Sequence, residues 1–233
     1  MAAPQAPALN RVSALALVPR LLRPPGVYAP QCDTQMLASA LCREHVGPHT
    51  DVLDMGSGTG VLALHAAWRG ARATAVDISW AAVWATRLNA LVSRTRVTVR
   101  HEDMTAAVRG QMYDIVVSNP PYVPSPSSRL PRCGRARAWD AGPDGRALLD
   151  RICDTAPGRL KPGGVLLLVQ SALSGTEATL ERLTGEGLHA EVVDRARISF
   201  GPVLRSRAPW LRRRGLMGEE NREEVVVIRA ARV

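Results

Sequence analysis

The sequence predicts an α/β fold in which helices cover both faces of a mostly parallel sheet. Short apolar runs alternate along the chain with segments whose apolar residues recur at helical spacing, an order typical of such folds. Strands that are apolar throughout indicate a sheet buried on both faces. The last two apolar runs have no clear helix between them, which predicts a final antiparallel hairpin. The 233 residues suffice for one large domain with its own core.

Turn and cap residues mark where each element begins and ends. Gly47-Pro48 ends the first helical pattern and Gly70 ends the second. Helices are therefore expected at residues 34–46, 61–69, 80–92, 142–156 and 175–184. Strands are expected at residues 51–55, 73–76, 97–100, 113–117, 164–169, 189–194 and 224–230. We divide the chain into an N-terminal extension, residues 1–26, and a domain of residues 27–233.

The charge and the cysteines limit the class of protein. The formal net charge is +9, and Lys161 is the only lysine, so arginine carries nearly all of the positive charge. A basic surface attracts nucleic acid, ribosomes or acidic proteins, although composition and solubility alone explain such a charge equally well. The four cysteines form no C-x-x-C pair, so we expect no metal site, no disulfides and a cytoplasmic protein. The apolar run at residues 12–18 is too short to span a bilayer, so no membrane contact is expected.

A glycine-rich turn follows the first expected strand. Its sequence is D-M-G-S-G-T-G, from Asp54 to Gly60. Glycines at Gly56 and Gly58 let the backbone approach a ligand closely, and the helix behind them presents free N–H groups. The dinucleotide fingerprint would need glycine where Val61 stands, and no P-loop spacing is present. The pattern resembles motif I of the class I methyltransferases, which bind S-adenosylmethionine; the alternative is a purely structural turn.

Two further strands end in acidic residues on the same side of the sheet. Asp77 follows the second strand, where a carboxylate can accept hydrogen bonds from both ribose hydroxyls. Asp103 and Met104 follow the third strand, where they can take the adenine amino group and lie against its ring. Each acid alone could cap a helix or lie in a solvated loop. Together with Asp54 they mark three successive strand ends facing one ligand.

The fourth expected strand runs directly into Asn119-Pro120-Pro121-Tyr122, the most specific motif in the chain. Two prolines fix the backbone and remove its N–H donors. An –NH₂ group needs two acceptors, which the Asn119 side-chain oxygen and the Pro120 carbonyl can supply. Holding both protons aims the nitrogen lone pair, and Tyr122 offers a flat face to a planar amide or base. Asn119, Pro120 and Tyr122 are the expected catalytic residues; the alternative is a rigid turn without chemistry.

Residues 27–233 resemble the HemK/PrmC family of class I methyltransferases, and more closely its short forms without an N-terminal helical domain. The resemblance also rests on Val27-Tyr28-Ala29-Pro30 with Asp33-Thr34, and on the stretch from Arg137 to Gly145. It implies a seven-stranded Rossmann-like methyltransferase fold and S-adenosylmethionine as cofactor. The expected cofactor contacts are Thr34, Asp54, Gly56, Gly58, Asp77, Asp103, Met104 and Asn119.

The same resemblance implies N-methylation of a glutamine side-chain amide in a protein, for instance a translation release factor. A nucleic-acid amino group, a small-molecule amide or guanidine, and a non-catalytic binding module are the alternatives. The short eukaryotic forms work with a small zinc-binding partner, so a small activating subunit is a further expectation.

The chain departs from the family in two places. Cys32 stands where an acid is expected. The segment 200–223 is long and rich in arginine between residues 205 and 214, with Trp210 among them. It could contact RNA, a ribosome or an acidic partner, or form an amphipathic helix over the sheet edge. A second basic cluster borders the expected substrate entrance and consists of Arg129, Arg132, Arg135 and Arg137.

Overall fold

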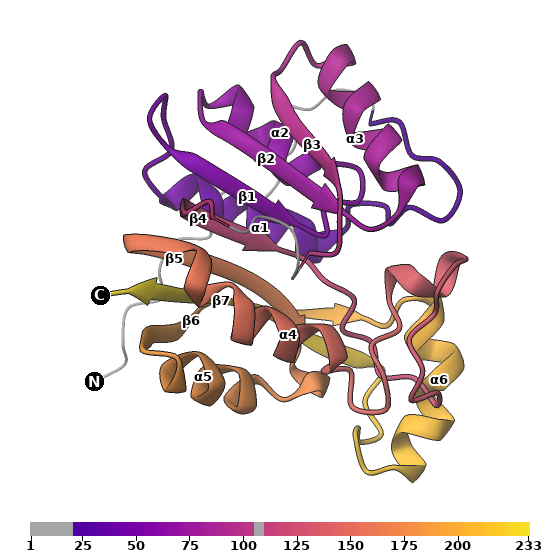
Figure 1. Ribbon diagram of the computed structural model, residues 1–233. Coiled ribbons are helices and arrows are strands. Elements are labelled where there is room, and N and C mark those ends of the chain that lie inside the picture. The colour runs from indigo at the N-terminus through magenta and orange to yellow at the C-terminus, as the bar shows by residue number, and fades with distance from the viewer. Residues whose placement is uncertain (1–20, 105–109) are drawn as a thin grey trace.

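The computed structural model describes residues 21–104 and 110–233 as a seven-stranded sheet with helices on both faces (Figure 1). The strands are β1 (Asp51–Met55), β2 (Arg72–Asp77), β3 (Val97–His101), β4 (Tyr113–Ser118), β5 (Leu160–Ser171), β6 (Leu188–Ser199) and β7 (Arg222–Arg232). The α-helices are α1 (Cys32–Arg43), α2 (Val61–Trp68), α3 (Trp80–Val92), α4 (Ala147–Thr155), α5 (Thr176–Gly185) and α6 (Pro202–Arg213). Three short 3₁₀ helices are η1 (Arg135–Ala138), η2 (Pro157–Arg159) and η3 (Ala172–Ser174).

The sheet has the order β3-β2-β1-β4-β5-β7-β6. Strands β1 to β5 pair in parallel, whereas β7 runs antiparallel between β5 and β6. The predicted parallel sheet and its terminal antiparallel hairpin are therefore confirmed. Strands β2 and β3 are added on one side of β1, and β4 and β5 on the other. The carboxyl ends of β1 and β4 therefore lie together at the point where the strand order reverses, which is where α/β proteins bind ligands.

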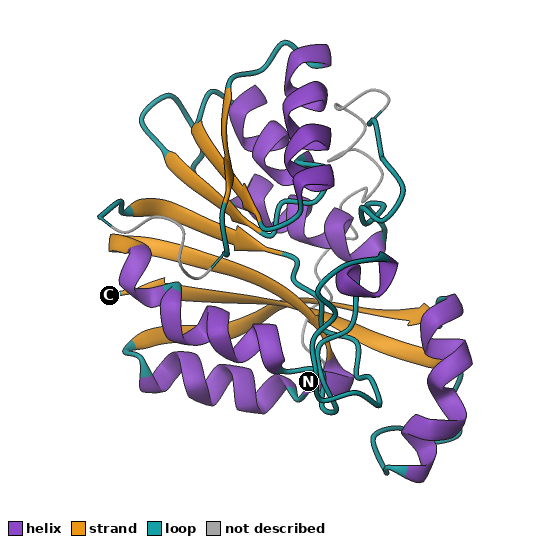
Figure 2. Cartoon of the chain, turned by 45° about the vertical axis from the view of Figure 1, so that its right-hand side comes forward, coloured by secondary structure: helices purple, strands orange, loops and turns teal. Residues whose placement is uncertain are grey.

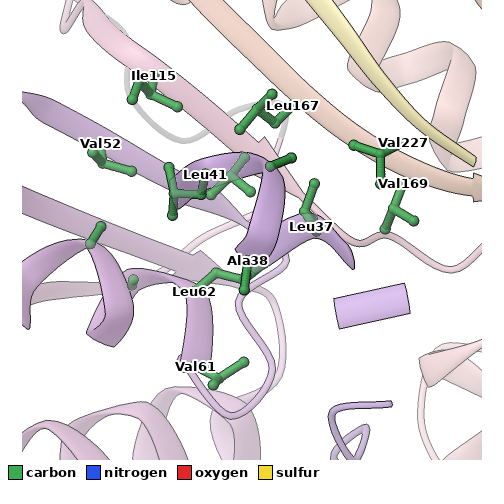
Figure 3. Close-up of a cluster of buried hydrophobic side chains, with 14 of the residues drawn as sticks. Leu37, Ala38, Leu41, Val52, Val61, Leu62, Ile115, Leu167, Val169 and Val227 are labelled. Atoms are coloured by element: carbon green, nitrogen blue, oxygen red, sulfur yellow. The ribbon is translucent and has the colours of Figure 1, made fainter. Parts of the chain in front are cut away.

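Helices lie on both faces of the sheet (Figure 2), and each face carries its own apolar core. Leu37 and Leu41 of α1 pack with residues of α2 against one face, as Figure 3 shows. Helices α4 and α5 pack against the other face, for example through Ile152 and Leu183. Successive residues of one strand alternate between the two cores, as strand geometry requires. Both faces of the central strands β1 and β4 are thus buried, which explains why these strands are largely apolar, whereas the edge strands β3 and β6 are partly exposed and carry polar residues.

The largest differences from the predicted element boundaries are in α4, β5 and β6. Helix α4 begins at Ala147 instead of residue 142, because Gly142 and Gly145 both have positive φ, which a helix cannot contain. Strand β5 begins at Leu160 instead of residue 164, so Lys161–Gly164 lie within the strand. A register shift between β4 and β5 accommodates these residues there. Strand β6 continues to Ser199, well beyond the expected residue 194.

The arginine-rich segment forms helix α6. Its inner face buries Leu204 and Leu211, which pack with Phe200 and the half-buried Trp210 in a third apolar cluster. The segment therefore forms the amphipathic helix that one of the two interpretations predicted, and Trp210 belongs to its packed face.

Most of the expected N-terminal extension lies outside the described residues, and with it the apolar run at 12–18. Within the described part, Leu22 is held by Asn89 of α3, which accepts from its N–H at 2.7 Å and donates to its carbonyl at 2.9 Å. No helix among the described residues is long and apolar enough to cross a membrane.

Candidate active site

The site lies at the carboxyl edge of the sheet, where β2, β1 and β4 end side by side. Strand register places Met55 of β1 beside Val76 of β2 and Ser118 of β4. The Ser118 hydroxyl donates to the Met55 carbonyl at 2.7 Å, and Gly56 N–H donates to the Val76 carbonyl at 2.9 Å. The glycine-rich turn and Asn119 are consequently neighbours, each one residue beyond a paired strand.

The glycines of the turn have distinct structural reasons. Gly56, Gly58 and Gly60 all have positive φ, which side-chain-bearing residues rarely adopt. A Cβ on Gly60 would lie 2.5 Å from Thr86 Cγ2, so Gly60 is required by packing against α3. A Cβ on Gly58 would meet nothing within 4 Å, so Gly58 faces open space. This cradle fits a nucleoside-bearing cofactor laid across the turn.

The carboxylate of Asp77 is fixed by the turn itself. Its Oδ2 accepts from Gly58 N–H at 2.9 Å and its Oδ1 accepts from Ser79 N–H at 2.8 Å. Burial raises the pKa of Asp77, while these two backbone hydrogen bonds act in the opposite direction. Each oxygen retains a second lone pair for a ligand hydroxyl. The neighbouring Ile78 is 41% exposed and offers an apolar face at this edge, a residue that the sequence pattern did not single out.

The residues after β3 line the other side of the turn. Met104 is buried, and its Cε lies 3.3 Å from where a Cβ on Gly56 would be. Asp103 forms an ion pair with Arg151 of α4 at 2.7 Å, with both side chains partly exposed. Asp103 therefore shares its charge with an arginine that sequence reasoning missed, because the two residues are 48 positions apart.

Asp54 lies beneath the turn rather than on its surface. Its side chain is 1% exposed, and its Oδ2 accepts from Ala63 N–H at 3.1 Å in the first turn of α2. Burial raises the pKa of Asp54 to about 7. This geometry gives Asp54 a visible role in holding the turn against helix α2.

The amide of Asn119 has an orientation that the structure determines. A carboxylate only accepts hydrogen bonds, so the Thr34 hydroxyl donates to Asp33 Oδ1 at 3.2 Å. The Thr34 oxygen then accepts from Asn119 Nδ2 at 3.0 Å. The carbonyl oxygen of the Asn119 amide is thereby turned away from Thr34 and can accept from another group.

Asp33 anchors Tyr122 as well. Its Oδ2 accepts from the Tyr122 hydroxyl at 2.9 Å and from the Tyr28 hydroxyl at 2.8 Å. Burial, reinforced by the negative charge of Asp33, raises the pKa of both tyrosines, which are therefore neutral donors. The Asn119–Tyr122 motif forms a corner whose backbone the two prolines fix, and the hydroxyl of Tyr122 ties this corner to α1. The sequence motif alone did not predict this contact.

The loop of residues 123–146, between the motif and α4, forms a wall beside the motif. The Tyr122 carbonyl accepts from the Ser174 hydroxyl at 2.6 Å, and a Cβ on Gly145 would lie 2.4 Å from that carbonyl. Only glycine fits there, which explains Gly145 near the expected helix start. Arg207 of α6 bonds to the Pro124 carbonyl and pairs with Asp140, so α6 is fastened to this wall.

The basic cluster lies along the same wall. Arg129, Arg132 and Arg135 are exposed, and Arg137 donates to the Arg132 carbonyl at 3.0 Å. Burial raises the pKa of Asp77 and the charge of Arg137 opposes that rise, which indicates that this loop lies near the Asp77 end of the site. No cluster of metal-binding residues is present in the described ranges 21–104 and 110–233.

Comparison with protein families and characterised relatives agrees with this geometry. The family model described as "Methyltransferase small domain" matches residues 20–129. A putative protein N5-glutamine methyltransferase of Methanocaldococcus jannaschii is 33% identical over 77% of this chain and 90% of that protein. A release factor glutamine methyltransferase of Moorella thermoacetica is 37% identical over 62% of this chain and 54% of its own length. The chain thus spans about half of that bacterial relative.

Two solved structures share the fold. The Thermus thermophilus 16S rRNA N2 G1207 methyltransferase, solved with AdoMet and guanosine, superposes with a TM-score of 0.61 at 22% identity, over 91% of this chain and 46% of its own. The E. cuniculi Mtq2–Trm112 complex superposes with a TM-score of 0.60 at 23% identity, over 89% of this chain and 99% of its own. The sheet order, the glycine turn and these relatives lead to one assignment. The chain belongs to the HemK/PrmC family of class I methyltransferases and is an N-methyltransferase enzyme that takes its methyl group from S-adenosylmethionine.

Proposed function

We propose that this enzyme methylates the side-chain amide nitrogen of a glutamine in a protein, with a translation release factor as the substrate. The observation that carries the proposal is the directed hydrogen-bond chain from Asn119 through Thr34 to Asp33. It leaves an acceptor oxygen at the corner where β4 ends, next to the glycine turn. A primary amide presents the two protons that such a corner can hold.

In this proposal the residues act by alignment. Asn119 Oδ1 accepts one proton of the acceptor amide and the Pro120 carbonyl accepts the other, so the nitrogen lone pair points toward the glycine turn. The same two oxygens stabilise the positive charge that develops on nitrogen. The ring of Tyr122, held by its hydroxyl on Asp33, forms one side of the acceptor pocket.

The cofactor residues divide the remaining work. S-adenosylmethionine supplies an activated sulfonium methyl when bound. Asp77 holds the ribose hydroxyls, and Gly56 and Gly58 give the backbone room to approach. Asp103 and Met104 face the adenine, Thr34 borders the methionine part, and Asp54 supports the turn from below.

The test is to locate the transferred methyl group. The purified enzyme is incubated with labelled S-adenosylmethionine and a recombinant bacterial release factor, and the digested product is analysed by tandem mass spectrometry. We expect one methyl group on a glutamine side-chain nitrogen, lost when that glutamine is replaced by glutamate. Label found only in material that nuclease removes would contradict the proposal.

The basic cluster favours an amino group of a nucleic-acid base as the second candidate for the methyl acceptor. Arg129, Arg132 and Arg135 are exposed on the loop that follows the Asn119–Tyr122 motif, and Arg205 and Arg213 are exposed on α6. If RNA or the ribosome is the docking partner, methyl transfer will fall steeply with rising salt, because phosphate contacts release counterions. Nuclease treatment of a whole-cell lysate separates the two candidates directly.

A release-factor substrate would place the enzyme in the cytoplasm. The same assay also tests for a small activating subunit. Turnover by the purified chain alone would show that none is needed, whereas turnover only after addition of lysate protein would indicate one.

A further inference from the structure

Glu223 is a buried acid at the acceptor side of the sheet that the proposed chemistry does not use. It lies at the start of β7, where its backbone pairs with Ile198 of β6. Its side chain is 8% exposed, and Ser171 at the end of β5 hydrogen-bonds to its carboxyl group. Its Oε2 is buried and has no hydrogen-bond partner in the described part of the chain.

The charge of Asp33 acts on Glu223, so the two carboxyl groups lie in one region, but they receive different numbers of hydrogen bonds. Asp33 accepts from four donors: the hydroxyls of Tyr28, Tyr122 and Thr34 and the Thr34 N–H. Glu223 has the Ser171 hydroxyl and one oxygen without a donor. A buried carboxylate needs donors to remain ionised, so Glu223, which has fewer donors, holds its proton more readily than an exposed glutamate.

Titratable groups from three segments lie close enough to Glu223 for their charges to affect one another's pKa. They are Asp33 of α1, Tyr28 of the segment before it and Tyr122 of the loop after β4, and each is coupled electrostatically to Glu223. The two neighbouring strands contribute no charge, since β5 provides Ser171 and β6 provides Ile198. Ionisation of Glu223 would thus place a second negative charge beside Asp33, against the hub that orients Asn119.

We propose that Glu223 is a positioning residue for methyl transfer, which acts as a neutral acid to preserve the Asp33–Thr34–Asn119 hydrogen-bond chain. When Glu223 loses its proton, its negative charge repels the Asp33 carboxylate. The hydrogen bonds that turn the Asn119 oxygen toward the acceptor then weaken. The role in catalysis rests on the proposed function of the acceptor corner, whereas the effect on Asn119 does not.

The pH at which this occurs follows from the surroundings. Burial foremost, and the charge of Asp33, raise the pKa of Glu223 to about 7, although the Ser171 hydrogen bond lowers it. The neutral fraction falls about tenfold between pH 6 and pH 8 for such a group. Glu223→Gln keeps the size and stays neutral throughout, so it isolates the effect of the proton.

The first measurement needs no substrate. The side-chain amide ¹⁵N resonance of Asn119 is followed from pH 5.5 to 8.5 in the wild type, in Glu223→Gln and in the control Glu224→Gln. Glu224 is the adjacent acid and pairs with Arg195. We expect a shift with a midpoint near 7 in the wild type and in Glu224→Gln, and none in Glu223→Gln. Identical titration in all three proteins would overturn the proposal.

Kinetics with a recombinant release factor provide the second measurement. The ratio of kcat for Glu223→Gln to kcat for the wild type should rise about tenfold from pH 6 to pH 8, and a constant ratio would contradict the positioning role. If Glu223→Gln does not fold, Ser171→Ala replaces it, with its amide midpoint displaced to higher pH; an unchanged midpoint would then count against the proposal. A release factor that the wild type leaves unmethylated would refute the proposed function, and the Asn119 resonance alone would then decide the role of Glu223.

Discussion

The two halves of the site are built in different ways. The cofactor half consists of backbone turns at three adjacent strand ends, and its polar groups bond mostly to nearby backbone, as Asp77 does to Gly58 and Ser79. The acceptor half is held by side chains from distant segments, since Asp33 and Tyr122 are 89 residues apart and Thr34 and Asn119 are 85 apart. Local motifs therefore describe the first half well and the second half poorly.

This difference separates tolerance from sensitivity. Backbone-built geometry survives most side-chain changes except at the glycines, whereas a buried hydrogen-bond network loses its order when one member is removed. Substitutions in the acceptor half should therefore change turnover more than cofactor affinity, and substitutions in the turn should do the reverse.

Replacement of Asn119 by Ala should have the largest effect. It removes the only oriented side-chain acceptor of the proposed corner, so we expect kcat to fall by about a thousandfold or more. Calorimetry should show S-adenosylmethionine affinity within roughly threefold of the wild type, since the turn is intact. A variant with turnover within tenfold of the wild type would contradict the assignment of Asn119.

Asp33→Asn should have the next largest effect. Asparagine can donate to Thr34, which reverses the hydrogen-bond chain and releases the Asn119 amide, and it loses the charge that holds both tyrosines. Loss of a charge-assisted hydrogen bond costs about 1.5–3 kcal/mol, so kcat should drop by roughly ten- to a hundredfold. The matched control is Asp154→Asn, an exposed acid paired with Arg182, for which steady-state kinetics should be unchanged. Equal losses in both variants would show that the Asp33 network has no special role.

Glycine substitutions should separate cofactor binding from stability. Gly58→Ala places a methyl group in the open cradle and should weaken S-adenosylmethionine binding by about tenfold. Gly60→Ala instead collides with Thr86, so thermal denaturation should show a loss of about 1–3 kcal/mol that Thr86→Ala partly relieves. If both variants bind cofactor equally well, Gly58 does not face the cofactor.

Asp54 should leave a smaller trace in the pH dependence of stability. Its folded pKa of about 7 lies above its usual value of 3.8, so the folded state holds the proton more tightly. The contribution of Asp54 to stability is then greatest below about pH 4 and falls with rising pH until about 7, by roughly 1.4 kcal/mol per pH unit. Chemical denaturation of Asp54→Asn should show a shallower slope in that window, and an unchanged slope would show that Asp54 is ionised in the folded protein.

Sequence patterns predicted every strand of the sheet and its terminal hairpin, because apolar periodicity and glycine punctuation are local properties. They also placed Gly56, Gly58, Asp77, Met104 and Asn119 at one edge. They did not reveal the anchoring of Tyr122 on Asp33, the ion pair of Asp103 with Arg151, or Glu223, since each depends on a contact between distant segments. The start of helix α4 was misplaced because Gly142 and Gly145 adopt positive φ, and at Gly145 this goes with close packing against the Tyr122 carbonyl, a contact between distant segments.

The most direct test of the account is a crystal structure with S-adenosylhomocysteine and a glutamine-containing release-factor peptide. The account predicts the adenosyl group across Gly56 and Gly58, its ribose on Asp77, and the peptide amide nitrogen within hydrogen-bond distance of Asn119 Oδ1 and the Pro120 carbonyl. An adenosyl group bound elsewhere, or an amide nitrogen held by other residues, would contradict it.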